Sequence, residues 1–389
     1  MAKSRISEKI SETNKKRILY YLFKNYNTFT TRTNISKDLN ISFPAVSNNV
    51  AQLIEEGFIL EELDTSSSLG RRSKKIYLNP NSKITIVVHI EYQNANIIFL
   101  DNHQNRLRQK KIVFERNIKF HDLWKLLENE IKTILGDLLS ENQCEVLGIC
   151  VAIPTPIDKK NKKIIKSRFY GWKDEPIYEY ITLEDKKIPV FWENDANLLA
   201  KGFYESNSRY DNVLAIYFSM GIGMGIIING DLYTGKEGNA GEIGQLKVEY
   251  KGEYEELEKI ISERSLIEFA KNKLNLTYED SEQILVELER NNQLSIVNKE
   301  FEYISKKIAD VFAPVIMVLD PEIVIFNGTV TRSCPSLTEN IVNKLEKLIE
   351  KNGIFEINRE ENLLIIKGSF WEVLDNVLGF NEIKTLKVL

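Results

Sequence analysis

The stretch SMGIGMGIIINGDLY, residues 219–233, decides the fold that we expect for this chain. Three glycines spaced two apart, Gly221, Gly223 and Gly225, precede an apolar strand and a tight Asn-Gly turn. Glycines let backbone N–H groups gather around an anion without a Cβ in the way, so such a loop can cradle phosphate. Two interpretations follow: a nucleotide-binding loop used in chemistry, or a structural turn retained from an ancestor that used it.

The whole chain has the composition of an ordinary globular protein. Its 389 residues are 43% hydrophobic and 28% charged, with room for two or three domains. No apolar run approaches the roughly 20 residues that span a bilayer, and the polar N-terminus lacks the apolar region of a signal peptide. We therefore expect a cytoplasmic protein with no membrane partner. Three cysteines without C-x-x-C spacing predict neither a disulfide framework nor a zinc knuckle.

Charge is unevenly distributed along the chain. Residues 1–80 carry 13 Lys and Arg against 8 Asp and Glu, whereas the remainder carries 39 against 48. A basic N-terminal segment on an acidic body indicates that one part of the protein meets a polyanion.

The N-terminal segment predicts three helices. Residues 14–27 and 31–40 carry apolar residues at helical spacing, and residues 41–59 place Ser42 at a cap, Pro44 in the first turn and Val46, Val50 and Leu53 on one face. A tight turn at Asn40-Ile41 joins the second and third helices, which is typical of a helix-turn-helix.

The outer face of the third helix and the segment after it favour DNA binding. That face presents Ser42, Pro44, Ala45, Ser47 and Asn48. Small side chains let a helix enter a major groove, and Ser and Asn bond base edges or phosphates. Residues 58–80 then predict two strands around a tip with Gly70, Arg71 and Arg72, a wing whose arginines suit a minor groove. The alternative is a three-helix interaction domain with a solvated basic hairpin.

From about residue 84 onwards, strands and helices alternate, so the body is expected to be α/β. Residues 83–101 predict a strand hairpin, and residues 146–158 predict a buried strand. Residues 188–204 predict a strand followed by a helix, and residues 300–328 predict a long helix entering a strand.

The chain resembles the ROK family (repressors, open reading frames and kinases), specifically the branch of xylose and N-acetylglucosamine regulators. The resemblance covers nearly the whole chain. It rests on Gly70-Arg71-Arg72, ENDAN (193–197), GIGMGIIINGDLY (221–233), GNAGEIG (238–244), LEKIISERSL (257–266) and DPEIVIFNG (320–328). It implies an actin-like, two-lobed ATPase fold of the sugar-kinase type, with a sugar bound in the cleft between the lobes.

Five residues are candidates for the sugar site that the resemblance implies, and three of them match residues of the family. Asp195 matches the general base of the kinases, and Asn194 beside it can both donate to and accept from a hydroxyl. Glu242 and Glu258 match carboxylates that hold sugar hydroxyls. Gln245 stands where the family usually has a histidine. For each residue singly, a cap or a surface charge is the alternative interpretation.

Two departures from the family pattern bear on function. The kinases hold ATP with an Asp-x-Gly-Gly-Thr turn in the first hairpin, but here His89 stands at that Asp, and Glu91 and Tyr92 stand at the glycines. A glutamate and a phenol ring would repel and obstruct a triphosphate. The family's zinc-binding cysteine cluster is also absent after Gln245, so no zinc and no cofactor are expected.

The sequence thus predicts a sugar-responsive transcriptional regulator, not an enzyme, that binds a palindromic operator as a homodimer or a dimer of dimers. Its expected parts are a winged helix-turn-helix domain (1–80), a first lobe (84–198 with a helix at about 370–389) and a second lobe (199–369). One alternative is an ATP-dependent sugar kinase with a fused DNA-binding domain. Another is a regulator with an empty sugar cleft, controlled by a protein partner.

Overall fold

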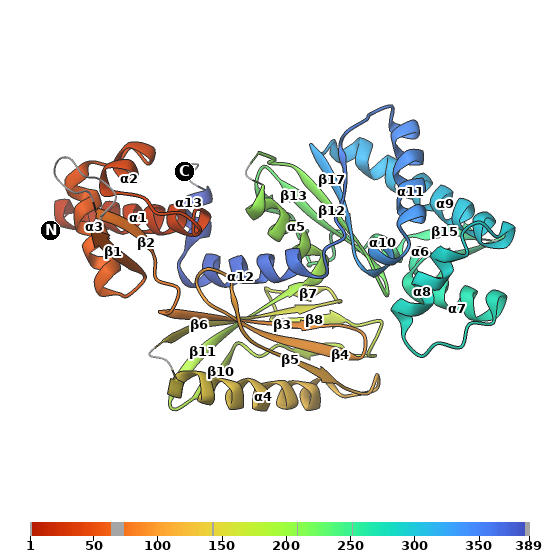
Figure 1. The fold of residues 1–389 in the computed structure, drawn as a ribbon, viewed down its shortest axis with the longest axis horizontal. Coiled ribbons are helices and arrows are strands. Elements are labelled where there is room, and N and C mark those ends of the chain that lie inside the picture. Colours follow the sequence, from red (N-terminus) through yellow and green to blue (C-terminus); the bar gives the residue numbers. More distant parts are fainter. Residues whose placement is uncertain (1, 64–73, 142–143, 208, 251, 386–389) are drawn as a thin grey trace. The chain divides into compact units, whose positions relative to one another are not determined.

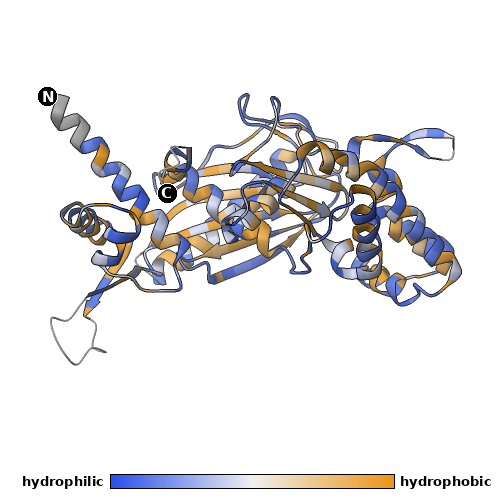
Figure 2. Ribbon diagram, turned by 90° about the horizontal axis from the view of Figure 1, so that it is seen from above, coloured by the Kyte–Doolittle hydropathy of each residue, from blue (hydrophilic) through white to orange (hydrophobic). Residues whose placement is uncertain are grey.

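The computed structural model describes residues 2–63, 74–141, 144–207, 209–250 and 252–385. The chain forms two compact units. The first unit comprises residues 1–151, 178–192 and 369–389, and the second comprises residues 152–177 and 193–368. The elements are labelled in Figure 1, and the central strands carry mostly hydrophobic residues (Figure 2).

The first unit begins with the three helices and the strand pair expected from the sequence. They are α1 (Ala2–Lys24), α2 (Arg32–Asp38), α3 (Phe43–Glu55), β1 (Ile59–Leu63) and β2 (Lys74–Leu78). α3 buries Val46, Val50 and Leu53, and β1 pairs with β2 antiparallel. Ser42 occupies the N-cap position of α3, but its side chain makes no capping hydrogen bond. The tip with Gly70, Arg71 and Arg72 lies outside the described residues.

A mixed sheet with the strand order β10-β11-β6-β3-β4-β5 forms the centre of the first unit. Its strands are β3 (Lys83–Ile90), β4 (Asn94–Leu100), β5 (Arg106–Val113), β6 (Glu145–Ile153), β10 (Tyr180–Leu183) and β11 (Lys186–Asn194). Every residue of β3 is buried, as expected for a β-branched-rich strand at the centre of a sheet covered on both faces.

Helices cover the two faces of this sheet. On one side lies α4 (Phe120–Glu141), which buries Leu127, Ile131 and Leu135 at four-residue spacing (Figure 1). On the other side, Val373 of α12 (Leu363–Val377) packs close to Gly148 of β6. The last helix, α13 (Phe380–Thr385), contacts α1 through the aromatic rings of Phe380 and Tyr20.

The second unit is built on a sheet with the strand order β14-β13-β12-β17-β18. These strands are β12 (Val213–Phe218), β13 (Ile222–Ile228), β14 (Asp231–Leu232), β17 (Ile323–Asn327) and β18 (Phe355–Ile357). β12 pairs antiparallel with β13 and parallel with β17.

Helices again lie on both faces of this sheet. α5 (Asp195–Ser206) packs against β12 and β13. Leu214, Ile216 and Phe218 of β12 share a hydrophobic core with α9 (Ser295–Leu319) and α11 (Pro335–Ile349). Because alternate side chains of a strand point to opposite faces, α5 lies across the sheet from α9 and α11.

Smaller elements complete the second unit. They are β7 (Ile157–Asp158), β8 (Lys163–Lys166), β9 (Lys173–Pro176), β15 (Lys247–Tyr250), β16 (Glu253–Glu256), the 3-10 turn η1 (Ile243–Gln245), α6 (Leu257–Ile260), α7 (Glu263–Leu274), α8 (Ser281–Arg290) and α10 (Thr329–Ser333). β16 leads directly into α6, which brings Glu256 and Glu258 close to η1.

Candidate functional site

Asn194 and Asp195 lie where β11 ends and α5 begins. The Oδ1 atom of Asn194 accepts hydrogen bonds from the backbone N–H groups of Ala196 and Asn197, so this side chain caps α5. Asp195 is buried, and its Oδ1 accepts from the N–H of Ala196 at 2.8 Å. The amide oxygen of Asn194 is therefore used within the protein, and only its Nδ2 group is left to donate to a ligand.

The glycines of the loop keep one face of β13 clear. Gly221 lies in the turn between β12 and β13, whereas Gly223 and Gly225 lie within β13, and none of the three has a positive φ. A turn therefore does not explain why residues 223 and 225 are glycines. A Cβ on Gly225 would lie 2.1 Å from the carbonyl oxygen of Ala196, and one on Gly223 would lie 2.9 Å from the Cβ of Ala196. These glycines are required because α5 packs directly on the strand backbone.

The turn before β13 brings the second part of the site close. A Cβ on Gly221 would lie 3.1 Å from the ring of Phe169 and 3.2 Å from Oε2 of Glu258. Because Gly221 directly precedes β13, Glu258 lies beside the start of this strand.

Three of the predicted sugar-binding residues are joined by one arginine. Gln245 Nε2 donates to Glu242 Oε2, and Arg168 Nη2 donates to Gln245 Oε1 at 2.9 Å. Arg168 Nη1 lies 3.4 Å from Glu258 Oε1 and also pairs with Glu256. The structure thus connects Glu242, Gln245 and Glu258 in a single polar network.

Burial controls the charge of the two carboxyl groups. Loss of solvent raises the pKa of Glu242; the Gln245 hydrogen bond and Arg168 lower it, while the nearby charge of Glu258 raises it further. Loss of solvent also raises the pKa of Glu258, and Arg168 opposes this. The cost of removing these carboxylates from water is only partly offset by their hydrogen bonds within the protein. Hydroxyl groups that donate hydrogen bonds to them would offset more of this cost, and a polyol supplies such groups.

Sequence reasoning missed Arg168, Phe169 and Glu256. Arg168 lies in an irregular segment between β8 and β9, and Gln245, to which it donates, is 77 residues away along the chain. No spacing rule links such positions.

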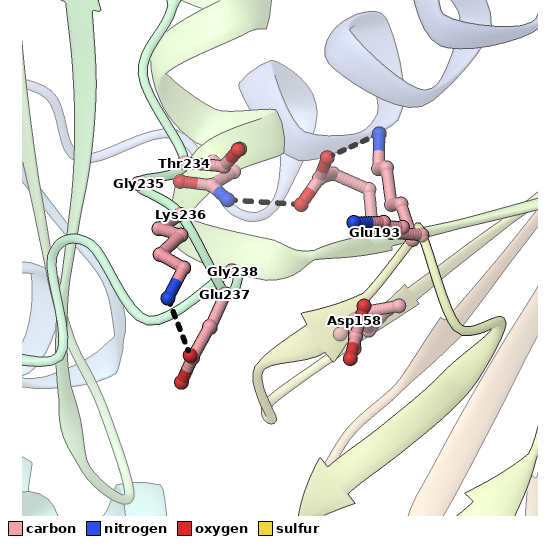
Figure 3. A pocket seen from close by; sticks show the side chains of 11 residues that line it. Asp158, Glu193, Thr234, Gly235, Lys236, Glu237 and Gly238 are labelled. Carbon is pink, nitrogen blue, oxygen red and sulfur yellow. Dashed lines mark hydrogen bonds and ion pairs between the residues drawn. The ribbon is translucent and has the colours of Figure 1, made fainter.

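A cavity of about 200 Å³ opens next to the start of α5 (Figure 3). Glu193 accepts from Asn197 Nδ2 at 2.9 Å and pairs with Lys159 at 2.7 Å. The lining residues are Ile157, Asp158, Lys159, Lys160, Glu193, Asn197, Thr234, Gly235, Lys236, Glu237 and Gly238. None of the five predicted sugar-binding residues lines it, although Glu193 and Asn197 flank two of them in the chain.

The predicted DNA-binding residues of α3 lie on its outer side. Ser42, Pro44 and Asn48 are exposed, whereas Ala45 and Ser47 are half-buried. The backbone carbonyl of Ser47 lies 3.5 Å from Arg32 Nη1, and Arg32 also pairs with Glu61 of β1. This pair ties α2 and α3 to the strand pair.

The first hairpin is formed by β3 and β4, as expected from the sequence. His89 pairs with Asn96 across β3 and β4, and Glu91 and Tyr92 lie in the turn, whose Glu91 N–H donates to Asn94 O at 2.8 Å. His89 is 1% exposed, and burial lowers its pKa, so the ring is neutral. Neither ring nitrogen has a hydrogen-bond partner within the described residues.

The described residues form neither a metal-binding cluster nor a membrane-spanning helix. No group of three or more His, Cys, Asp or Glu side chains in these ranges is arranged to hold a metal ion. The helices in the same ranges are too short or too polar to cross a bilayer.

The order of these elements and motifs is that of one protein family. The ROK family model matches residues 86–359. The chain belongs to the ROK family. The match spans both units, from β3 to the segment after β18.

Two curated relatives that match over most of their length are named as regulators of transcription or as repressors. The xylose repressor of Staphylococcus xylosus is 28% identical over 357 residues, which cover 87% of this chain and 87% of that protein. The DNA-binding transcriptional dual regulator NagC of Escherichia coli (strain K12) is 23% identical over 333 residues, which cover 81% and 80%.

Solved structures share the ROK fold. A ROK family transcriptional regulator, described as a homolog of the E. coli MLC protein, has a TM-score of 0.75 and 18% identity, covering 97% of this chain and 99% of that chain. A ROK family glucokinase from Streptomyces griseus, solved with glucose and AMPPNP, has a TM-score of 0.57 and 20% identity, covering 74% and 97%. These likenesses establish an actin-like sugar-kinase fold of mixed α/β content.

Proposed function

We propose that this chain is a sugar-responsive transcriptional repressor that binds operator DNA and senses a monosaccharide without phosphorylating it. The observation that carries the proposal is a polar network in the part of the chain that matches the ROK family. The network consists of Glu242, Gln245, Arg168 and Glu258. Three helices and a strand pair precede this part of the chain. Two curated relatives that match over most of their length are named as a xylose repressor and as a DNA-binding transcriptional dual regulator.

The N-terminal segment is the proposed winged helix-turn-helix. α3 is the recognition helix, with Ser42, Pro44, Ala45, Ser47 and Asn48 facing DNA, and β1 and β2 are the wing. Arg71 and Arg72 at the wing tip supply the minor-groove contacts. We divide the chain into this domain (1–80), a first lobe (84–198 with about 370–389) and a second lobe (199–369), acting as a homodimer or dimer of dimers on a palindromic operator.

The second unit provides the proposed sugar site. Asp195 and Glu242 accept hydrogen bonds from sugar hydroxyls, Asn194 donates through Nδ2, and Gln245 and Glu258 complete the site. The free energy lost when these side-chain oxygens are removed from water is offset only when hydroxyl groups donate hydrogen bonds to them. A neutral monosaccharide is the ligand class that fits.

The absence of phosphorylation rests on the first hairpin. A buried neutral His89 and the side chains of Glu91 and Tyr92 stand where the kinases have a metal-organising carboxylate and two glycines. A coupled ATPase assay with each sugar that binds tests this; turnover above the protein-free rate would favour the sugar-kinase alternative.

The experiment that tests the sugar site has two readouts. Thermal-shift screening against a sugar panel identifies the ligand, and calorimetry with operator titration then compares the parent with Asp195→Ala. We expect the variant to lose at least about 1.5–3 kcal/mol of sugar affinity, the value of a charged hydrogen bond, and to bind DNA normally without sugar.

Asp280→Ala is the matched control, because Asp280 is also a carboxylate at a helix start, where it caps α8. It should keep the sugar response. An Asp195→Ala protein that still responds like the parent would refute the site, and a panel without any stabilising sugar would favour regulation by a protein partner.

A further inference from the structure

An exposed phenylalanine begins the outer face of α3. Phe43 is the first residue of this helix, and its side chain is 51% exposed. Val46, Val50 and Leu53 point the opposite way, into the core. The rest of the outer face is small or polar, so Phe43 is its one large apolar side chain between residues 42 and 52.

About half of the surface of Phe43 is left uncovered by the described protein. Its ring makes no aromatic or cation–π contact with the described residues. Phe29, which is 57% exposed in the same segment, provides the contrast, because its ring lies under Lys75 Nζ at 4.3 Å. A large apolar group left in water at the start of a helix gains free energy from any partner that covers it.

Charge and position point to duplex DNA as that partner. No residue from Ser42 to Gln52 is charged, and the segment 1–80 around this helix carries 13 basic against 8 acidic residues. The first residues of a recognition helix reach the base edges of the major groove. The 5-methyl group of thymine is the apolar group that those edges present.

We propose that Phe43 contacts a thymine methyl group and is a specificity-determining residue of the operator complex. The inference rests on the proposed DNA-binding function. It adds a residue that recognises a base through an apolar methyl group and not through hydrogen bonds to the base edge.

Replacing thymine by uracil in the DNA removes only the methyl group and so tests the contact directly. An operator is first selected from a random duplex library with the full-length parent protein. Each thymine of one half-site is then replaced by deoxyuridine, and the affinities of the parent and of Phe43→Ala are compared at fixed salt. Removing one methyl group that is buried in the complex should lower the binding affinity about fourfold.

We expect the affinity of the parent to fall about fourfold when uracil replaces thymine at one position. Phe43→Ala should bind the duplexes with thymine and with uracil at that position with equal affinity. Val113→Ala is the control, because Val113 is 75% exposed on β5; it should keep the parental uracil pattern. Because Phe43 is exposed, its removal should leave the thermal midpoint unchanged, which excludes misfolding as a cause.

Three results would overturn the inference. An identical uracil pattern in the parent and Phe43→Ala would show that the ring touches no methyl group. A change of oligomeric state in Phe43→Ala with an unchanged pattern would assign the ring to a protein interface. Failure of the parent to enrich any duplex would refute DNA binding itself and the inference with it.

Discussion

Gly225 offers a direct test of why the glycine-rich stretch is retained. In the structure, a Cβ at this position would lie 2.1 Å from Ala196 O and 2.7 Å from Ala200 Cβ, both on α5. Because the first opposing atom belongs to a helix backbone, Gly225→Ala cannot be accommodated by a rotamer change. α5 must move away from β13, and the beginning of the helix with Asn194 and Asp195 moves with it.

The expected loss lies at the upper end of the range for over-packing, about 3 kcal/mol. For a unit of about 200 residues, 1 kcal/mol shifts the melting temperature by about 2–4 °C, so the second unit should melt roughly 6–12 °C lower. Gly223→Ala should cost less, because its closest contact is a single methyl group at 2.9 Å.

Differential scanning calorimetry measures the effect, with Gly136→Ala as the matched control. Gly136 lies in α4 with nothing within 4 Å of an added Cβ, so alanine should stabilise that helix by about 0.5–1 kcal/mol. A Gly225→Ala protein that melts at or above the parent would refute the packing argument and return the loop to its interpretation as a ligand cradle.

Three further predictions concern DNA, metal and pH. Replacing Arg71 and Arg72 with alanine should weaken operator binding by roughly 1–3 kcal/mol per lost contact and flatten its salt dependence; unchanged affinity at fixed salt would contradict the wing assignment. Purified protein should contain no stoichiometric zinc, and a chelator should leave its melting temperature unchanged, whereas elemental analysis finding one zinc per chain would reveal a missed ligand set. Because burial raises the pKa of Glu242 above its usual 4.5, the folded state holds this proton more tightly, and stability is lost as pH rises through that window. Glu242→Gln should therefore melt above the parent at about pH 7, and the difference should vanish by about pH 4; a difference independent of pH would contradict this.

The sequence by itself determined the local elements and the family. Val46, Val50 and Leu53 at helical spacing are buried in α3, and the β-branched run from Ile84 forms the buried strand β3. Such patterns are readable because the period of the side chains along one element decides which of them leave water. The ROK motifs are likewise contiguous runs of residues, so their order along the chain was enough to identify the family.

Only the tertiary structure decided how distant residues are used. Arg168 joins Gln245 and Glu258 across 77 and 90 residues of chain, and no local pattern encodes contacts between an irregular segment, a 3-10 turn and a separate helix. The side-chain oxygen of Asn194, which we expected to accept a hydrogen bond from a sugar hydroxyl, instead accepts one from the backbone N–H of Ala196 and caps α5. Gly223 and Gly225 are retained because α5 rests on β13, a close approach that depends on the packing of whole elements and not on the conformation of the loop.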